Sequence, residues 1–166
     1  MHRPADRLPT CGRMRASAPT TSRKQNYNGE IMQVKIIGAG LAGCEAALWL
    51  ADYGVQVALY EQKPEKFSPA HKSAGFAELI CSNSLKAERP DSASGLLKLE
   101  MKMMGSHLLD AAETARVAAG GALAVDRDVF STAVTEMVEK HPNITIHREE
   151  VKYFLMQATA NSKRDT

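Results

Sequence analysis

Three glycines in the segment GAGLAG, residues 38–43, constrain the fold of this chain more than any other feature. Gly38, Gly40 and Gly43 have the spacing G-x-G-x-x-G, after the apolar stretch VKII and before a helix predicted from Leu41 to about Tyr53. The first glycine permits a tight turn, the second lets the backbone approach a ligand closely, and the third allows the helix to pack on the strand. A pyrophosphate fits at the amino end of such a helix.

An acidic residue follows the second predicted strand of this unit. The strand runs from Val55 to Tyr60, and Glu61 comes 23 residues after Gly38. A carboxylate there can accept hydrogen bonds from both hydroxyls of an adenosine ribose and disfavours a 2′-phosphate, so FAD or NAD is favoured over NADP. We therefore predict an α/β, Rossmann-like FAD/NAD(P)-binding domain with a parallel sheet. The predicted cofactor-binding residues are Gly38, Ala39, Gly40, Leu41, Ala42, Gly43 and Glu61. The alternative is a Rossmann-like unit whose glycines serve packing alone.

Further helices and strands are predicted after a loop over residues 62–75, which contains two prolines. The predicted elements are a helix over 96–104 with Ser94 as its N-cap, a helix over 107–116, a strand over 122–125, a helix over 127–140 with Asp126 as its N-cap, and a strand over 143–147 parallel to the first two. We expect Met101, Met103 and Met104 to fill the core, and Val129, Phe130, Ala133, Val134, Met137 and Val138 to form the buried side of the last helix.

Composition limits the classes of protein to which the chain can belong. At 166 residues it is long enough for one domain. No stretch approaches the roughly 18 uncharged apolar residues that cross a bilayer, so no membrane partner is predicted. Cys11, Cys44 and Cys81 are widely spaced, which predicts neither a metal site nor a disulfide framework and suits a reducing cytoplasm. After residue 31 the chain has 15 Lys and Arg against 17 Asp and Glu, which gives no evidence of a basic patch.

Residues 1–31 differ from the rest of the chain. They hold six Lys and Arg against two acids, three of the seven prolines, and no apolar periodicity. This composition indicates a disordered segment, an upstream stretch included by a misassigned start, or a targeting segment. Residues 32–151 are predicted to form the FAD-binding domain.

Four segments carry a family resemblance. They are PAH (69–71), FAELICSNSLKA (76–87), GLLKLEM (95–101) and AAGGALAVDRDVF (118–130). Together with the glycine segment, they resemble the folate- and FAD-dependent tRNA (uracil-5-)-methyltransferases, relatives of the GidA flavoproteins. The resemblance extends from Val34 to about Glu150.

This resemblance implies a cytoplasmic enzyme that binds FAD. NADPH or NADH would be the reductant, methylenetetrahydrofolate the carbon donor, and C5 of a uridine in the T-arm of tRNA the acceptor. It implies a catalytic role for Cys81, as nucleophile or as proton-transfer group; the alternative is a small buried hydrophobic residue. It also implies flavin or substrate contacts from His71, Ser82, Asn83 and Arg127, although Arg127 could simply begin its helix. Cys44 is expected to pack against the sheet.

From about Lys152 the resemblance ends, and residues 152–166 are predicted to be a divergent tail. We expect an N-terminal fragment whose Rossmann-like fold is incomplete at the C-terminus, which binds FAD poorly and is inactive alone. A generic FAD-dependent oxidoreductase without a tRNA substrate and a non-functional remnant are the alternatives. The sequence leaves open whether the chain forms a homodimer.

Overall fold

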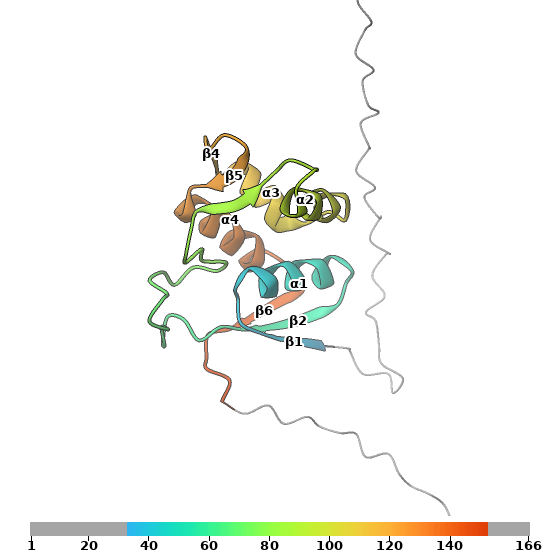
Figure 1. Cartoon of the computed structure of the whole chain (residues 1–166). Helices are drawn as coiled ribbons and strands as arrows, with labels where there is room; N and C mark the ends of the chain where they lie inside the picture. The colour runs from blue at the N-terminus through green and yellow to red at the C-terminus, as the bar shows by residue number, and fades with distance from the viewer. Residues whose placement is uncertain (1–32, 153–166) are drawn as a thin grey trace, which may run out of the picture.

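The computed structural model describes residues 33–152, and Figure 1 shows how their helices and strands are arranged. The predictions for residues 1–31 and for the tail from 153 onward lie outside this range. The elements in chain order are β1 (Gln33–Ile37), α1 (Leu41–Asp52), β2 (Gln56–Tyr60), β3 (Ser84–Ala87), α2 (Ala93–Met103), α3 (His107–Thr114), β4 (Arg116–Val117), β5 (Ala122–Val125), α4 (Arg127–Glu139) and β6 (Ile144–His147).

A parallel sheet of order β1-β2-β6 forms the base of the fold. Val34 pairs with Val57, and Val57 pairs with Ile144, so the three strands end at the same edge of the sheet. Helices α1 and α4 contact this sheet and lie on the same side of it (Figure 1). The predicted α/β fold with a parallel sheet is confirmed, as is the third parallel strand.

Helix α1 begins at the glycine turn and ends at a second glycine. After the C-cap residue Tyr53, Gly54 has a φ of +77°, in the left-handed region that favours glycine. Its N–H donates to the carbonyl of Ala51 at 3.0 Å, and the N–H of Val55 donates to that of Leu50 at 3.1 Å. These two bonds are the Schellman arrangement, which turns the chain directly into β2.

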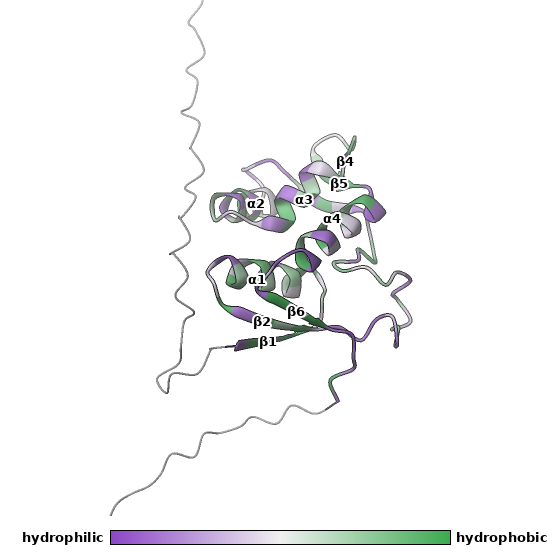
Figure 2. Ribbon diagram, turned by 180° about the vertical axis from the view of Figure 1, so that it is seen from behind, coloured by the Kyte–Doolittle hydropathy of each residue, from purple (hydrophilic) through white to green (hydrophobic). Residues whose placement is uncertain are grey.

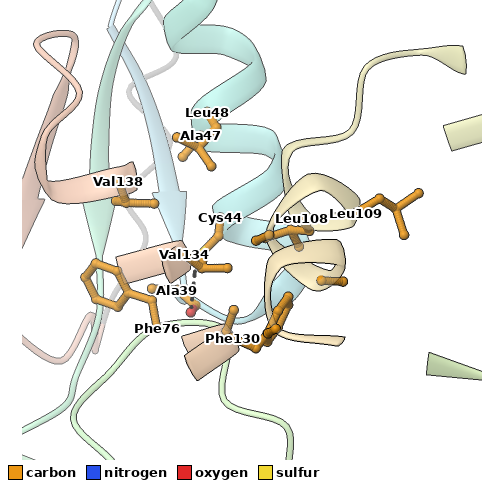
Figure 3. Close-up of a cluster of buried hydrophobic side chains, with 14 of the residues drawn as sticks. Ala39, Cys44, Ala47, Leu48, Phe76, Leu108, Leu109, Phe130, Val134 and Val138 are labelled. Carbon is orange, nitrogen blue, oxygen red and sulfur yellow. Dashed lines mark hydrogen bonds between the residues drawn. The ribbon is translucent and has the colours of Figure 1, made fainter. Parts of the chain in front are cut away.

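The core lies between α1, α3 and α4 on one face of the parallel sheet. Figure 3 shows Phe76, Phe130 and Val134 packed near Cys44, and all four side chains are fully buried. Apolar residues predominate in the strands and in α1, whereas the segment after β2 begins with polar residues (Figure 2). The packing of α1 and α4 on the sheet therefore holds the carboxyl edge of the strands in a fixed position.

A second, antiparallel sheet of order β3-β5-β4 lies on the far side of α4 (Figure 1). The predicted strand over 122–125 is confirmed as β5, but β3 and β4 were not predicted. The β3 sequence SLKA has little strand propensity, and its register with β5 shifts between Ser84 and Ala87. The helix predicted to end at Arg116 ends at Thr114, because Arg116 pairs with Val125 in this sheet.

The prediction that the methionines of α2 fill the core is wrong for two of the three. Met103 is 79% exposed and Met104 is 64% exposed, while Met101 is half-buried against the core. Helix α2 lies at the periphery, where it contacts β3 and α3, so its C-terminal end has no layer to pack against.

The predicted N-cap of α2 is also wrong, by two residues. Ser92 is the N-cap and accepts a hydrogen bond from the N–H of Gly95, whereas Ser94 lies inside the first turn and donates to the carbonyl of Ala87. Gly95 is needed here because a Cβ at this position would lie 1.9 Å from the carbonyl oxygen of Arg89.

Helix α4 begins as predicted. The Asp126 side chain accepts hydrogen bonds from the N–H groups of Asp128 and Val129, each at 3.0 Å. Phe130, Val134 and Val138 are fully buried, and Ala133 and Met137 pack against the core from partly buried positions. Val129 is 49% exposed, contrary to prediction, because it lies in the first turn beyond the edge of the core.

Candidate functional site

The glycine turn between β1 and α1 leaves open space above the helix N-terminus. Gly38 has a φ of +96°, and its N–H donates to the carbonyl of Tyr60 at 2.7 Å. Gly40 is the N-cap of α1, and a Cβ built there would meet no heavy atom within 4 Å. No side chain caps the helix and no acidic residue lies in its first turn. Among residues 33–152, no side chain therefore fills the space beside Gly40, at the positive end of the helix dipole and its first amides.

Gly43 has a different role from Gly40. A Cβ at Gly43 would lie 1.9 Å from the carbonyl oxygen of Gly38 and 3.5 Å from a methyl group of Ile36. Helix α1 thus packs directly on the turn that precedes it. Leu41 and Ala42, the first two helical residues, contribute backbone amides to the open space rather than side-chain chemistry.

Glu61 lies beside the glycine turn, as the strand spacing predicts. Its side chain is buried, with Oε2 accepting from the N–H of Ala39 at 2.9 Å and Oε1 accepting from the N–H of Lys63 at 3.1 Å. A carboxylate has about four acceptor positions, so these bonds leave capacity for ribose hydroxyls. The space over Gly40 and this carboxylate are the groups that could hold the ADP half of a dinucleotide, the helix end for a pyrophosphate and Glu61 for a ribose.

The loop between β2 and β3 runs along the carboxyl ends of the parallel strands (Figure 1). It touches the glycine turn where the N–H of Ala77 donates to the carbonyl of Ala39 at 2.9 Å. Ala77 is fully buried and has a φ of +49°, in the left-handed region that non-glycine residues seldom adopt. Ala39 is thus held at its N–H by the Glu61 carboxylate and at its carbonyl by the N–H of Ala77.

An ion pair between buried Lys63 and partly buried Glu78 ties the same loop to the end of β2. The ammonium of Lys63 lies 3.3 Å from Oε2 of Glu78, whose Oε1 accepts from the N–H groups of Lys72 and Ser73. Burial would raise the pKa of Glu78, but these amides and the Lys63 ammonium outweigh that effect, and its pKa lies below the usual value. Sequence reasoning missed Lys63 and Glu78, because nothing in the local pattern indicates that residues 15 apart will pair.

We expect the contacts of Glu78 to be lost only as the pH falls below the ordinary pKa of a glutamate, about 4.3. Because its pKa is lower in the folded chain, the carboxylate contributes stability that is present above its unfolded pKa of about 4.3 and is lost as the pH falls through the folded value. The amide chemical shifts of Lys72 and Ser73 should therefore titrate by NMR with a midpoint below about 4.3. Glu78→Gln should abolish this titration. A midpoint above that of a free glutamate would contradict the assignment.

The structure places Cys81, Ser82 and Asn83 in an exposed segment just before β3. The Ser82 hydroxyl accepts from the N–H of Ser84 at 3.0 Å, and the Asn83 carbonyl accepts from the N–H of Val125 at 2.9 Å. These bonds attach the segment to the antiparallel sheet, so its position is fixed although its side chains are exposed. The exposure of Cys81 contradicts the alternative of a small buried hydrophobic residue.

Cys44 is buried, as expected. Its thiol donates to the carbonyl of Ala39 at 3.3 Å, and burial raises its pKa to about 12 (Figure 3). A thiol in this environment stays protonated and packs as a small apolar group.

The two remaining predicted residues lie in different settings. Nδ1 of His71 is 2.6 Å from the hydroxyl of Ser68, within the loop after β2, and the imidazole is half-buried. Arg127 is the first residue of α4, and its side chain is exposed.

Within residues 33–152, no group of three metal-binding side chains could hold a metal ion, and no helix is long and apolar enough to cross a membrane.

Comparison with known proteins gives one family and a consistent set of relatives. The family model described as glucose inhibited division protein A matches residues 33–163. The methylenetetrahydrofolate–tRNA-(uracil-5-)-methyltransferase TrmFO of Geobacter sulfurreducens is 58% identical over 118 residues, which are 71% of this chain and 27% of that protein. The protein of the same name from Aquifex aeolicus is 55% identical over 120 residues, or 72% and 27% of the two chains. The chain thus spans about a quarter of the length of these relatives.

A solved structure supports the fold. Aquifex aeolicus GidA in its form II crystal superposes with a TM-score of 0.56 at 19% sequence identity, covering 71% of this chain and 19% of that one. At this level of identity the likeness concerns the fold alone.

Proposed function

Because this chain belongs to the family described as glucose inhibited division protein A, we propose that it supplies the FAD-binding part of a methylenetetrahydrofolate-dependent tRNA (uracil-5-)-methyltransferase. The observation that carries this proposal is the 58% identity to a relative of that name. The open glycine turn and the adjacent carboxylate of Glu61 support it, because they suit the ADP half of FAD. The proposed donor of the carbon is methylenetetrahydrofolate, the reductant is NADPH or NADH, and the acceptor is a uridine in the T-arm of a cytoplasmic tRNA.

The residues of this chain are proposed to have the following roles in binding and chemistry. The first-turn amides of α1 bind the pyrophosphate, and Glu61 accepts hydrogen bonds from the ribose. The bound flavin would carry the one-carbon unit and the reducing equivalents. Uracil C5 is a poor nucleophile until a group adds to C6 or a proton is removed, so a thiolate or a base is required near it. Cys81 is the proposed group, since it is exposed while the Cys44 thiol is buried and protonated.

His71, Ser82, Asn83 and Arg127 are proposed to contact flavin or substrate. Ser82 and Asn83 adjoin Cys81, and His71 lies in the loop that reaches the glycine turn. The assignments of His71, Ser82 and Asn83 rest on the family resemblance and on their placement in the segment between β2 and β3, whereas that of Arg127, at the start of α4, rests on the resemblance alone.

A chimera tests the role of Cys81. Residues 33–150 would replace the matching part of the Geobacter sulfurreducens relative, and methyl transfer to a T-arm minihelix would be measured per bound flavin. We expect the chimera to methylate the uridine. Its Cys81→Ala variant should keep the flavin and lose at least about a hundredfold in rate, the usual scale for removal of a positioned acid, base or nucleophile.

The matched control is Cys44→Ala in the same chimera, which should keep its rate per bound flavin because that thiol is buried and its one hydrogen bond, to the Ala39 carbonyl, bears on the glycine turn and not on the substrate. Equal rates for the Cys81→Ala variant and the unaltered chimera would exclude Cys81 from the chemistry. A chimera that binds flavin and oxidises NADPH without methylating the minihelix would favour a generic flavin oxidoreductase.

A further inference from the structure

Lys63 is a buried lysine in a place where a core residue would ordinarily be apolar. It lies two residues after Glu61 and is 3% exposed. Its Nζ donates to the carbonyl of Gly75 at 2.7 Å and to Oε2 of Glu78 at 3.3 Å. Burial of an ammonium is costly unless it is paired and hydrogen-bonded, and here both partners belong to the loop between β2 and β3.

The ion pair of Lys63 and Glu78 is part of a group of contacts that hold this loop at several points. Glu78 accepts from the N–H groups of Lys72 and Ser73 and from the Lys63 ammonium, so one carboxylate joins the two ends of the segment 72–78 to each other and to Lys63. Arg148, just after β6, donates to the carbonyls of Lys63 and Ala74, and its guanidinium lies 4.2 Å from the centre of the Phe76 ring. The segment is therefore bound to the ends of both β2 and β6.

The same residues connect directly to the dinucleotide site. The N–H of Lys63 donates to Oε1 of Glu61, and Oε2 of Glu61 accepts from the N–H of Ala39. The carbonyl of Ala39 accepts from the N–H of Ala77, inside the segment that Lys63 holds. These bonds form a closed circuit through Glu61, the glycine turn, the loop and the Lys63 side chain.

We propose that Lys63 is a positioning residue of the dinucleotide site: its ion pair with Glu78 holds segment 72–78 against the glycine turn, so that Glu61 holds the N–H of Ala39 and Ala77 holds its carbonyl. This inference rests on the proposed flavin site. An apolar residue would fill the same volume without making these bonds, so the ammonium and not the packing of its carbon chain supplies the attachment.

The test compares four variants of the whole chain with the unaltered chain. Lys63→Met removes the ammonium and keeps the side-chain length, and Lys63→Arg keeps the charge. A double variant, Lys63→Met with Glu78→Gln, leaves no unpaired buried charge and so guards against simple unfolding. Lys66→Met is the matched control, because Lys66 is an exposed lysine of the same loop, paired with Glu150.

Hydrogen exchange over residues 72–78 and FAD affinity are the two readouts. Lys63→Met and the double variant should exchange at least about tenfold faster in this segment and bind FAD at least about tenfold more weakly, since loss of a charge-assisted bond is commonly worth that factor. Lys63→Arg should keep most of the exchange protection and most of the FAD affinity. Lys66→Met should match the unaltered chain in both measurements.

Unchanged exchange in Lys63→Met, or an equal loss in Lys66→Met, would overturn the inference. Faster exchange with unchanged FAD affinity would also overturn it, because the segment would then be held without serving the site. If the unaltered chain binds no FAD, the proposed function fails, while the exchange measurement still decides whether Lys63 holds the loop.

Discussion

Replacement of Gly43 with alanine is expected to destabilise the fold by about 3 kcal/mol, at the upper end of the usual cost of overpacking. The added Cβ would lie 1.9 Å from the carbonyl oxygen of Gly38, and that oxygen belongs to the backbone of the glycine turn, which cannot rotate away as a side chain can. Relief requires α1 to move off the turn. Because α1 contacts all three strands of the parallel sheet, the movement would disturb the main core as well.

Urea unfolding followed by circular dichroism measures this effect, and Gly40→Ala is the control. A Cβ at Gly40 would meet nothing within 4 Å, and the φ of −75° at this residue suits alanine. Gly40→Ala should therefore keep the stability of the unaltered chain within about 0.5 kcal/mol, as surface substitutions usually do. Similar midpoints for Gly43→Ala and the unaltered chain would show that the helix does not pack on the turn as described.

The second large effect is expected at Glu61, where replacement with glutamine should weaken FAD binding nearly as much as replacement with alanine. Each carboxylate oxygen accepts a hydrogen bond from a backbone N–H, one from Ala39 and one from Lys63. A glutamine amide has a single acceptor oxygen, so its NH₂ group would face a backbone donor at close range in either orientation. Hydrogen bonds to a charged acceptor are worth about 1.5–3 kcal/mol each, so FAD affinity should fall by at least about tenfold in both variants.

Flavin fluorescence during titration reports this affinity, and Glu65→Gln is the matched control. Glu65 is an exposed carboxylate in the same loop, so its replacement should leave FAD binding unchanged. A Glu61→Gln variant that binds FAD as tightly as the unaltered chain would mean that the carboxylate does not organise the site.

The first half of the fold could be predicted because its signals are local. The glycine spacing, the apolar strands and the acid at residue 61 all lie within one continuous segment, and each feature constrains the next. Asp126 was predictable for the same reason, since an N-cap acts on amides two and three residues ahead.

The parts of the fold and of the site that the sequence did not predict depend on contacts between residues far apart in the chain. Strand β3 exists because it pairs with β5, which follows it by more than 30 residues, and its own composition does not favour a strand. Met103 and Met104 are exposed because α2 lies at the periphery, which an apolar pattern alone cannot reveal. The pairing of Lys63 with Glu78 is likewise set by the path of the loop across the sheet edge, and so it was not found from the sequence.

The central claim is that the glycine turn and Glu61 form a site for the ADP half of FAD, and a competition titration tests it most directly. The chain would be titrated with FAD in the absence and presence of ADP or FMN. We expect saturable FAD binding that ADP displaces and FMN does not. Gly40→Val should abolish this binding by filling the space above the helix N-terminus. FAD binding that survives Gly40→Val, or that FMN displaces while ADP does not, would contradict it.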